Sequence, residues 1–466
     1  MGVISVLVWL DSISGDYFFK LYDMGELSNL HEFFDEGALV ENAVATFPTV
    51  SESAEGSIIT GLFSGEVNIL GERYFSRSLA RVMHYKFNAR IEEDFPDSLK
   101  GYTIDRLSGG SLGIGRLIPV NAEIVHDPIA EEYERKGSLK LVERRVYTAV
   151  NLLKEKKPRL LLFTVSADYA SHVSGREGHM VKSILKTFDE LFPEIIKALR
   201  NVSDEFSVFV FSDHGSKEVS KHLDLTQLLI EYGFNPSDPG LLNTQKGCSS
   251  AALSNGRRMG MIYLKHPEAG WAKLEARVLR NYPFGGSRLD VSELLSQEEG
   301  IGLLAYRESE NRVIVRSRDG EGVIEHDGER YRYLIVRGND PLNYEPQLYG
   351  KWMNEEEWLK TTYNEKFPDA IVQLFSIFKA ANCGDIILNP SDGWDFWEPW
   401  DIHYPKLVAS HGGLSREEMR VFILARGPGI KRKRIPYSRL LDMYATLSAY
   451  YTNKTLKTHA VERLFS

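Results

Sequence analysis

Four short apolar runs, far apart along the chain, constrain the fold of this sequence more than any other feature. They occupy residues 3–10, 159–166, 207–212 and 420–425. Apolar residues fill most positions of each run instead of alternating with polar ones, so each run predicts a strand that is covered on both faces. Strands of this kind are typical of parallel sheets that lie between two layers of helices.

Helical patterns stand between these strands. Residues 134–156 form one such pattern, and residues 179–200 form a second, with apolar residues at helical spacing and an expected kink at Pro193. The alternation of strands and helices indicates a doubly wound α/β fold. We therefore expect a mostly parallel sheet with helices on both faces.

The pattern changes in the second half of the chain. From about residue 255 to residue 344 the sequence reads as short strands joined by Asp-Gly turns, which predicts antiparallel hairpins. A helical pattern follows at residues 367–381, and the α/β pattern then resumes. We predict an α/β core formed by residues 1–239 and 401–466. A smaller inserted α+β cap region is expected at residues 240–400.

Charge and composition exclude several classes of protein. The formal net charge of the 466 residues is −9, which disfavours general binding to a nucleic-acid backbone. Cys248 and Cys383 are the only cysteines, so neither a disulfide framework nor a cysteine-based zinc site is expected.

The first residues, "MGVISVLVWLDS", are interpreted as a core strand. They lack the basic start and the small-residue cleavage site of a signal peptide. No run of about 18 apolar residues exists, so we expect no membrane span and no membrane partner. The cytoplasm is the expected compartment.

Residues that can bind metal or act as nucleophiles follow these strands or begin helices. Ligands of doubly wound sheets bind beyond the carboxyl ends of the strands, so these residues are expected to converge. They are Asp11, Ser51, Asp168, His172, Asp213, His214 and His411.

Two of these places carry local signals of their own. Thr49 and Glu52 have the spacing of a capping box, which places Ser51 in the first turn of a helix, where free amides favour an anion. Asp168 and His172 are four residues apart, so their side chains share one side of a helical turn and suit one metal ion. Each residue alone has a structural explanation as a cap, a turn residue or a packed histidine. Together, the mixture of Asp and His favours a site for two zinc-like ions.

Five segments resemble the alkaline phosphatase superfamily, and specifically its type I phosphodiesterase/nucleotide pyrophosphatase branch, and they occur in the chain order of that family. They are Asp11, "FPTVSESAEGSIITGL", "DYASH", "SDHG" and "SHGGLSREEMRVFILARGPGI". The resemblance implies an alkaline phosphatase-like fold and two divalent ions, zinc or alternatively manganese.

The resemblance also assigns a role to each matching residue. It implies that Asp168, His172 and His411 hold one ion. Asp11, Asp213 and His214 would hold the other ion, which also binds the oxygen of Ser51. The substrate would be a small phosphorylated molecule. Metal coordination would make the serine alkoxide accessible, and Ser51 would form a phosphoseryl intermediate.

Three positions depart from the family pattern. Ser51 stands where a threonine is common, and "EVNI" at residues 66–69 replaces "SHGI". Glu72 aligns with the asparagine that binds the phosphoryl group. A carboxylate would repel a phosphate oxygen unless it were protonated, turned away or paired with a cation, and Arg73 is a candidate for the missing positive charge. Serine is chemically equivalent to threonine, whereas Glu72 bears on the class of substrate and not on the metal site.

The favoured interpretation is a hydrolase of phosphodiesters or nucleotide pyrophosphates. A phosphomonoesterase or phosphonate hydrolase using the same site is the alternative. A phosphosugar mutase is disfavoured because the main insertion follows Asp213 and His214. A sulfatase is rejected because Ser53 and Glu55 stand where proline and arginine are required. The last alternative is a metal-stabilised binding protein without turnover, and only Glu72 supports this interpretation.

The tryptophans of the inserted region allow two interpretations. The segment 392–405 contains Trp394, Trp397 and Trp400. These side chains either stack on a base or sugar of the substrate, or pack the insertion onto the core. Packing is favoured because large aromatic side chains dominate core burial.

Overall fold

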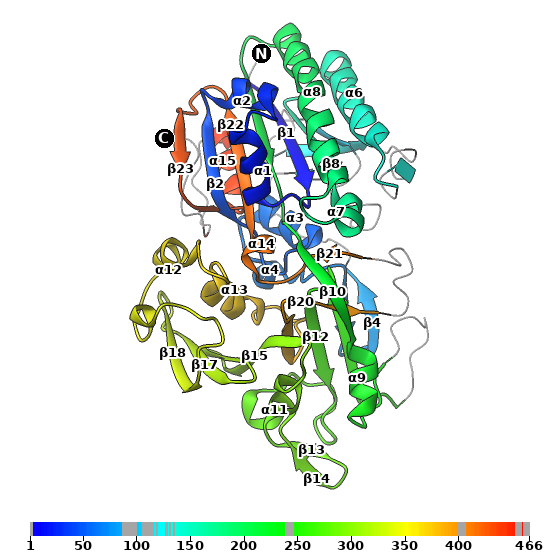
Figure 1. Ribbon diagram of the computed structural model, residues 1–466, viewed down its shortest axis with the longest axis vertical. Coiled ribbons are helices and arrows are strands. Elements are labelled where there is room, and N and C mark those ends of the chain that lie inside the picture. The colour runs from blue at the N-terminus through cyan, green and yellow to red at the C-terminus, as the bar shows by residue number, and fades with distance from the viewer. Residues whose placement is uncertain are drawn as a thin grey trace.

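A ten-stranded sheet is the framework of the upper lobe (Figure 1). The computed structural model describes residues 3–85, 100–104, 116–117, 120–125, 129, 132–133, 136–237, 247–398, 407–452 and 459. Within these residues the strand order is β23-β2-β22-β9-β1-β8-β5-β7-β6, and β24 pairs with β2. The strands are β1 (Ile4–Asp11), β2 (Ala38–Val44), β5 (Lys100–Ile104), β6 (Arg116–Leu117), β7 (Val120–Val125), β8 (Leu160–Ser166), β9 (Phe206–Phe211), β22 (Arg420–Arg426), β23 (Lys433–Ile435) and β24 (Ser438–Arg439).

The central strands of this sheet are the four predicted apolar runs. Strands β1, β8 and β9 are parallel, as expected. Strand β22 differs, because it is antiparallel to both of its neighbours, β9 and β2. The chain returns from the lower lobe to the sheet at the edge where the parallel strands end. Strand β22 therefore begins at that edge and runs in the opposite direction to those strands.

Helices cover both faces of the sheet, which confirms the predicted doubly wound α/β fold. Alternate residues of β1 point to opposite faces, Val6 and Val8 to one cluster of buried side chains and Leu7 and Trp9 to another. The helices on the first face are α1 (Gly15–Asp23), α2 (Ser28–Phe34), α6 (Leu139–Lys156) and α8 (His179–Val202). Those on the second are α3 (Ser51–Thr60) and α15 (Asp442–Thr452). Helix α8 continues through Pro193.

The lower lobe is built on a second sheet, in which all seven strands are antiparallel to their neighbours. In spatial order its strands are β11 (Ser250–Asn255), β12 (Met259–Leu264), β19 (Ile386–Pro390), β15 (Ile301–Ser309), β16 (Arg312–Arg316), β17 (Gly320–His326) and β18 (Tyr331–Gly338). The predicted hairpins are therefore confirmed.

Shorter elements surround this second sheet. They are β10 (Lys217–Asp224), α9 (Leu225–Glu231), α10 (Ala276–Leu279), β13 (Tyr282–Phe284), β14 (Ser287–Leu289), α11 (Val291–Ser296), η1 (Pro346–Leu348), α12 (Glu355–Thr362), α13 (Ala370–Ile377) and β20 (Gly393–Trp397). Strand β10 and helix α9 lie in the lower lobe of Figure 1 although they precede residue 240. The division at residues 240 and 400 remains a prediction.

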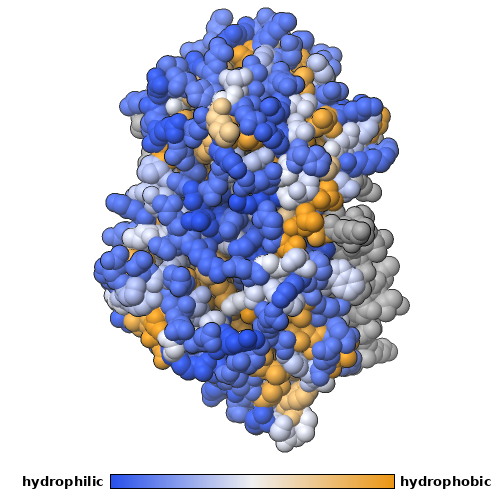
Figure 2. All heavy atoms as spheres, viewed as in Figure 1, coloured by the Kyte–Doolittle hydropathy of each residue, from blue (hydrophilic) through white to orange (hydrophobic). Residues whose placement is uncertain are grey.

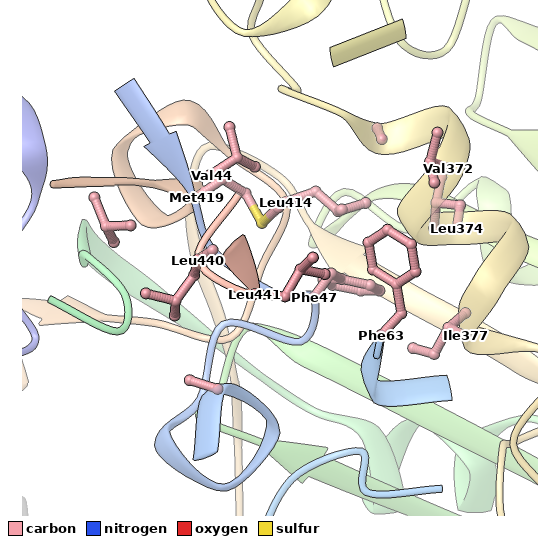
Figure 3. Close-up of a cluster of buried hydrophobic side chains, with 14 of the residues drawn as sticks. Val44, Phe47, Phe63, Val372, Leu374, Ile377, Leu414, Met419, Leu440 and Leu441 are labelled. Atoms are coloured by element: carbon pink, nitrogen blue, oxygen red, sulfur yellow. The ribbon is translucent and has the colours of Figure 1, made fainter. Parts of the chain in front are cut away.

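One of the three clusters of buried side chains is shared by the two lobes. The largest cluster of buried side chains combines residues of the upper sheet with residues of β11, β12 and α13. Figure 3 shows part of this cluster, in which Val372, Leu374 and Ile377 of α13 lie near Phe63 and Phe47. The lower lobe is thus packed against the segment that leads to Ser51.

Half-buried charged groups also join the lobes, at His459. The imidazole of His459 lies 2.8 Å from Glu66 of α4 (Ser64–Val67) and 2.9 Å from Glu355 of α12, and its ring packs on Phe63. Burial opposes protonation, but hydrogen bonds to the two carboxylates raise the pKa of His459 to about 9. Burial likewise opposes ionisation of Glu66, yet His459 lowers the pKa of that carboxyl to about 2.

We predict that His459→Gln destabilises the protein in a pH-dependent way. A histidine whose pKa is raised on folding stabilises fully below its unfolded value, and the effect is lost as the pH rises through the folded value. The substitution should lower the free energy of unfolding by about 2 kcal/mol near pH 6, and the difference should shrink as the pH rises from about 6.5 and be nearly gone above about pH 9. Urea unfolding at several pH values measures it. A difference that stays constant from pH 6 to 9.5 would contradict the assignment.

The outer surface seen in Figure 2 is largely hydrophilic over both lobes, with apolar residues in small groups. None of the described helices combines the length and apolar character that a membrane span requires. Cys248 and Cys383 are both buried free thiols.

Candidate active site

The carboxyl edge of the upper sheet brings together residues from distant parts of the chain. Strand β1 ends at Asp11, while Asp168 and Asp213 each stand two residues beyond the ends of β8 and β9. These strands are parallel neighbours, so their ends meet at one edge. Strand β2 also runs in this direction, and Ser51 follows it as the first residue of α3.

Two hydrogen bonds, one of them from the turn after β1, orient two of the acids. Ser12 adopts a left-handed conformation with φ of 63°, which is uncommon for a residue other than glycine. Its amide donates a hydrogen bond to Oδ1 of Asp213 at 3.2 Å. The hydroxyl of Ser166 donates to Oδ2 of Asp11 at 3.0 Å. Both carboxylates are therefore fixed, each with its other oxygen on the Ser51 side.

Ser51 lies beside the more deeply buried group of ligands. Its hydroxyl donates to Oδ2 of Asp213 at 2.9 Å and lies 3.5 Å from both Oδ1 of Asp11 and Nε2 of His214. One ligand atom from each of Asp11, Asp213 and His214 lies within 4.8 Å of the others, a spacing that one ion could bridge. All three residues are buried.

A second group lies at the more open side of the site. Oδ1 of Asp168 is 3.4 Å from Nε2 of His172 and 3.3 Å from Nε2 of His411. Asp168 and His172 share one turn of α7 (Asp168–Ser174), as their spacing predicts. These three residues also have ligand atoms within 4.8 Å of one another. Asp168 is only half-buried, so this group faces outward more than the first.

The three histidines all present the same ring nitrogen to the site. Nδ1 of His172, His214 and His411 contacts the backbone carbonyl of Ala409, Gly215 and Thr49, respectively, at 2.8, 3.0 and 2.9 Å. Because a carbonyl only accepts, each Nδ1 carries a proton, and in the neutral ring Nε2 is then a lone-pair donor directed at the carboxylates. Metal-binding histidines are oriented in this way.

The charges of the site call for cations. Burial lowers the pKa of His214, although Asp213 opposes the shift, so this imidazole is neutral beside two buried carboxylates. In the second group burial would raise the pKa of Asp168, but the two histidines hold it well below its ordinary value. Burial likewise disfavours charge on His411, yet Asp168 raises its pKa to about 9. In the first group two buried carboxylates face a neutral imidazole, and in the second Asp168 holds a proton on Nε2 of His411, where a cation could take its place. The donor set fits divalent ions of the zinc type.

The two groups touch through their histidines. The rings of His214 and His411 are stacked, with centroids 4.1 Å apart, and the rings of His172 and His411 are 5.2 Å apart. The seven residues that the sequence singled out thus form one continuous cluster. Their roles as ligands and nucleophile are proposals, taken up below.

The predicted capping box does not form. Helix α3 begins at Ser51 with Val50 as its N-cap residue. The hydroxyl of Thr49 instead donates to the carbonyl of Gly413 at 2.8 Å and accepts from the amide of Gly412 at 2.9 Å. Thr49 therefore ties the segment before Ser51 to the loop that carries His411. The prediction failed because this competing partner lies more than 360 residues away in the sequence.

Arg73 and Glu72 lie at the start of the hairpin formed by β3 (Arg73–Ser76) and β4 (Arg81–His84). The guanidinium of Arg73 forms an ion pair with Glu398 and donates to the carbonyl of Ser254 at 3.2 Å. The side chain of Glu72 is exposed. The positive charge of Arg73 is thus shared with another carboxylate, Glu398.

Residues 5–413 match the protein family described as type I phosphodiesterase / nucleotide pyrophosphatase. The chain belongs to this family. The match spans most of the chain and includes all seven clustered residues.

Curated relatives of the family align with part of the chain. The bis(5′-adenosyl)-triphosphatase ENPP4 of Mus musculus is 24% identical over 241 residues, which are 50% of this chain and 52% of the mouse protein. The human ENPP4 is 23% identical over 46% of this chain and 48% of its own length. The alignments thus span about half the length of these relatives.

Solved structures share the fold over nearly the whole chain. Human ectonucleotide pyrophosphatase / phosphodiesterase 5 has a TM-score of 0.58 at 15% identity and covers 98% of this chain and 96% of its own. Phosphonoacetate hydrolase from Sinorhizobium meliloti 1021, in complex with phosphonoformate, has a TM-score of 0.55 at 15% identity, with 95% and 94% covered. This likeness confirms the predicted fold.

Two tryptophans of the segment 392–405 are not fully buried. Trp397 is 38% exposed and Trp394 is half-buried, whereas Phe396 between them is fully buried. Packing onto the core, the favoured interpretation, therefore fails for Trp397. Trp400 lies outside the described residues.

Several supporting contacts were not foreseen. Thr49, Ser166, Arg258 and Glu418 hold the segments that carry the cluster. Ser166 could have been found from the sequence, since it is a polar residue at the end of a buried strand and stands two positions before Asp168. The sequence carries no local signal for Glu418 or Arg258, because their ion pair joins the two lobes.

Proposed function

We propose that the protein is a two-metal hydrolase that cleaves phosphodiester or nucleotide pyrophosphate bonds. The observation that carries the proposal is the position of Ser51. Its hydroxyl stands at a helix N-terminus, 2.9 Å from Asp213 and beside two groups of three residues that could each hold an ion. Membership of the phosphodiesterase family supports the same reaction class.

We assign one cation to Asp168, His172 and His411, and a second to Asp11, Asp213 and His214 together with the oxygen of Ser51. The mixture of carboxylate and imidazole favours zinc, with manganese as the alternative. Bound cations would make the serine alkoxide accessible at neutral pH and offset the negative charge of the phosphoryl group.

Ser51 is the proposed nucleophile. Its oxygen attacks phosphorus, so that an O–P bond forms and the bond to the leaving oxygen breaks. Water then cleaves the phosphoseryl ester and restores the hydroxyl. The hydrogen bond to Asp213 holds the oxygen in place before the attack.

The N-terminus of α3 is the proposed phosphoryl-binding element. Val50 has no polar side chain with which to cap the first-turn amides, so these amides can donate to phosphate oxygens. Arg73 is already paired with Glu398 and Glu72 is exposed, so we propose a secondary role for both in substrate binding. This arrangement offers a substitute for the asparagine of the family.

Relatives of known substrate suggest finer assignments. The bis(5′-adenosyl)-triphosphatase relatives suggest a dinucleotide polyphosphate, and a complex of murine ectonucleotide pyrophosphatase / phosphodiesterase 5 with AMP suggests a nucleotide. Phosphonate hydrolysis is kept as the alternative because Glu72 replaces the family asparagine and a phosphonoacetate hydrolase shares the fold. A cytoplasmic location suits the two buried free thiols.

We predict a clear order of activities for the metal-loaded protein. Diadenosine triphosphate and bis-p-nitrophenyl phosphate should be cleaved with kcat/KM at least about tenfold above p-nitrophenyl phosphate and phosphonoacetate. Steady-state assays with each substrate measure this order. If the protein prefers the monoester or the phosphonate, the alternative activity, that of a phosphomonoesterase or phosphonate hydrolase, would replace the proposed one. Absence of turnover on all four would favour a binding protein.

A further inference from the structure

One buried carboxylate, that of Glu418 in α14 (Arg416–Met419), holds the loop that carries His411. Its Oε1 accepts hydrogen bonds from the amide of Gly413 at 2.7 Å and from Nε of Arg258 at 2.9 Å. Its Oε2 accepts from the hydroxyl of Ser415 at 2.6 Å. Gly413 has no room for a side chain, because a Cβ atom there would lie 2.7 Å from the carboxylate. The loop is thus clamped two residues after His411.

The backbone of Glu418 also holds the segment that carries His214. Its carbonyl accepts a hydrogen bond from the amide of Gly215 at 2.8 Å. A Cβ atom on Gly215 would lie 2.1 Å from the carbonyl of the preceding residue, Glu417, so the two segments are in close contact. One residue therefore contacts the neighbours of a histidine from each ligand group.

The partner of Glu418 comes from the lower lobe. Arg258 and Glu418 are both fully buried, and Arg258 also bonds the carbonyl of Trp394. Two residues earlier, Gly256 lies against His411, since a Cβ atom there would be 2.7 Å from Nδ1. Asn389 of β19 accepts from the amide of Leu414 at 2.8 Å. The lower lobe thus contacts the His411 loop at three places.

We infer that Glu418, paired with Arg258, is a positioning residue through which the lower lobe sets the metal affinity of both ligand groups. The inference rests on the proposed two-metal function and adds a role for the inserted region within it. A buried ion pair that loses one charge leaves the other uncompensated, so a change at Glu418 should displace Gly413 and Gly215. Partners beyond the direct ligands tune metal affinity because they orient those ligands.

The full-length Glu418→Gln protein tests this inference. Glutamine keeps the size and one acceptor oxygen but removes the charge that Arg258 needs. We expect zinc affinity, measured by competition with a chromogenic chelator, to fall about tenfold or more. We also expect the visible absorption bands of the Co²⁺-loaded protein to shift, since they report ligand geometry. Arg258→Lys, which keeps the charge but loses the planar fork, should weaken zinc binding by about threefold or more.

Asp385→Asn is the matched control. Asp385 is also a buried carboxylate, and it accepts hydrogen bonds from two backbone amides, those of Leu264 and Leu274, and from Arg77. This change should lower the thermal unfolding temperature about as much as Glu418→Gln while leaving zinc affinity and the Co²⁺ spectrum unchanged. A merely structural role for Glu418 predicts the same result for both variants.

The outcomes separate this inference from the proposed function. If Glu418→Gln and Arg258→Lys bind two ions with wild-type affinity and spectrum, the inference is overturned while the function stands. If the wild-type protein binds two ions but hydrolyses no phosphate ester, and the variants bind them weakly, the function fails and the inference is supported. Wild-type protein without metal affinity would overturn both.

Discussion

Ser51→Ala should abolish the turnover of bis-p-nitrophenyl phosphate, with a loss in kcat of at least about a thousandfold. The hydroxyl is the nucleophile in the proposed reaction, and an alanine methyl group cannot form the phosphoryl ester. Fold and metal content should stay unchanged, because Asp11, Asp213 and His214 still supply three ligands to the ion beside position 51. Steady-state kinetics and metal analysis on the same preparation provide the measurements.

Two further variants bracket this result. Ser51→Thr should retain turnover, since threonine keeps the hydroxyl and is common at this position in the family. Ser57→Ala removes a buried hydroxyl from the same helix, α3, and should keep activity within about threefold of wild type. Full activity in Ser51→Ala would exclude the covalent route. Loss of activity in all three variants would point to a general sensitivity of α3.

The residues of the site were predictable from sequence because each ends or follows a local element. Asp11 ends a strand, and Asp168 and Asp213 stand two residues beyond strands, and the apolar character of all three strands is visible in a window of eight residues. The parallel arrangement of those strands places their ends at one edge, so convergence follows from topology alone. Ser51 was placed at a helix start by a capping signal that the structure does not use, and the placement was still correct.

Other features depend on contacts that no local window contains. The direction of β22 follows from where the chain returns from the lower lobe, and Thr49 bonds Gly413 instead of capping α3. The ion pair of Arg258 and Glu418 joins residues 160 positions apart in the sequence. Contacts of this kind lie outside any local window, so the residues that cluster could be predicted from the sequence, but the contacts that hold their loops could not.

Purified without chelators, the protein should contain two zinc equivalents, and Asp213→Ala should contain about one. Asp213 is fully buried, accepts from the amide of Ser12 and the hydroxyl of Ser51, and shares its ligand group with Asp11 and His214. Alanine removes one of two carboxylates from that group and leaves only Asp11 and His214 beside the oxygen of Ser51, fewer than the three Asp, Glu, His or Cys ligands of catalytic zinc sites. The group of Asp168 keeps all three of its members. Elemental analysis of the dialysed proteins gives the stoichiometry.

Asp189→Ala is the control for this metal loss. Asp189 is also a buried aspartate and accepts hydrogen bonds from the amides of Asn29 and Leu30 on the far face of the sheet. Its removal should cost stability, about 1–3 kcal/mol for the two amides left unpaired, while two zinc equivalents remain. Two equivalents in Asp213→Ala would show that this carboxylate is no ligand. A zinc content near zero in the wild-type protein would remove the basis for activating Ser51. The serine hydroxyl lies beside two buried carboxylates and a neutral imidazole, and a bound cation is needed there to make its oxygen nucleophilic.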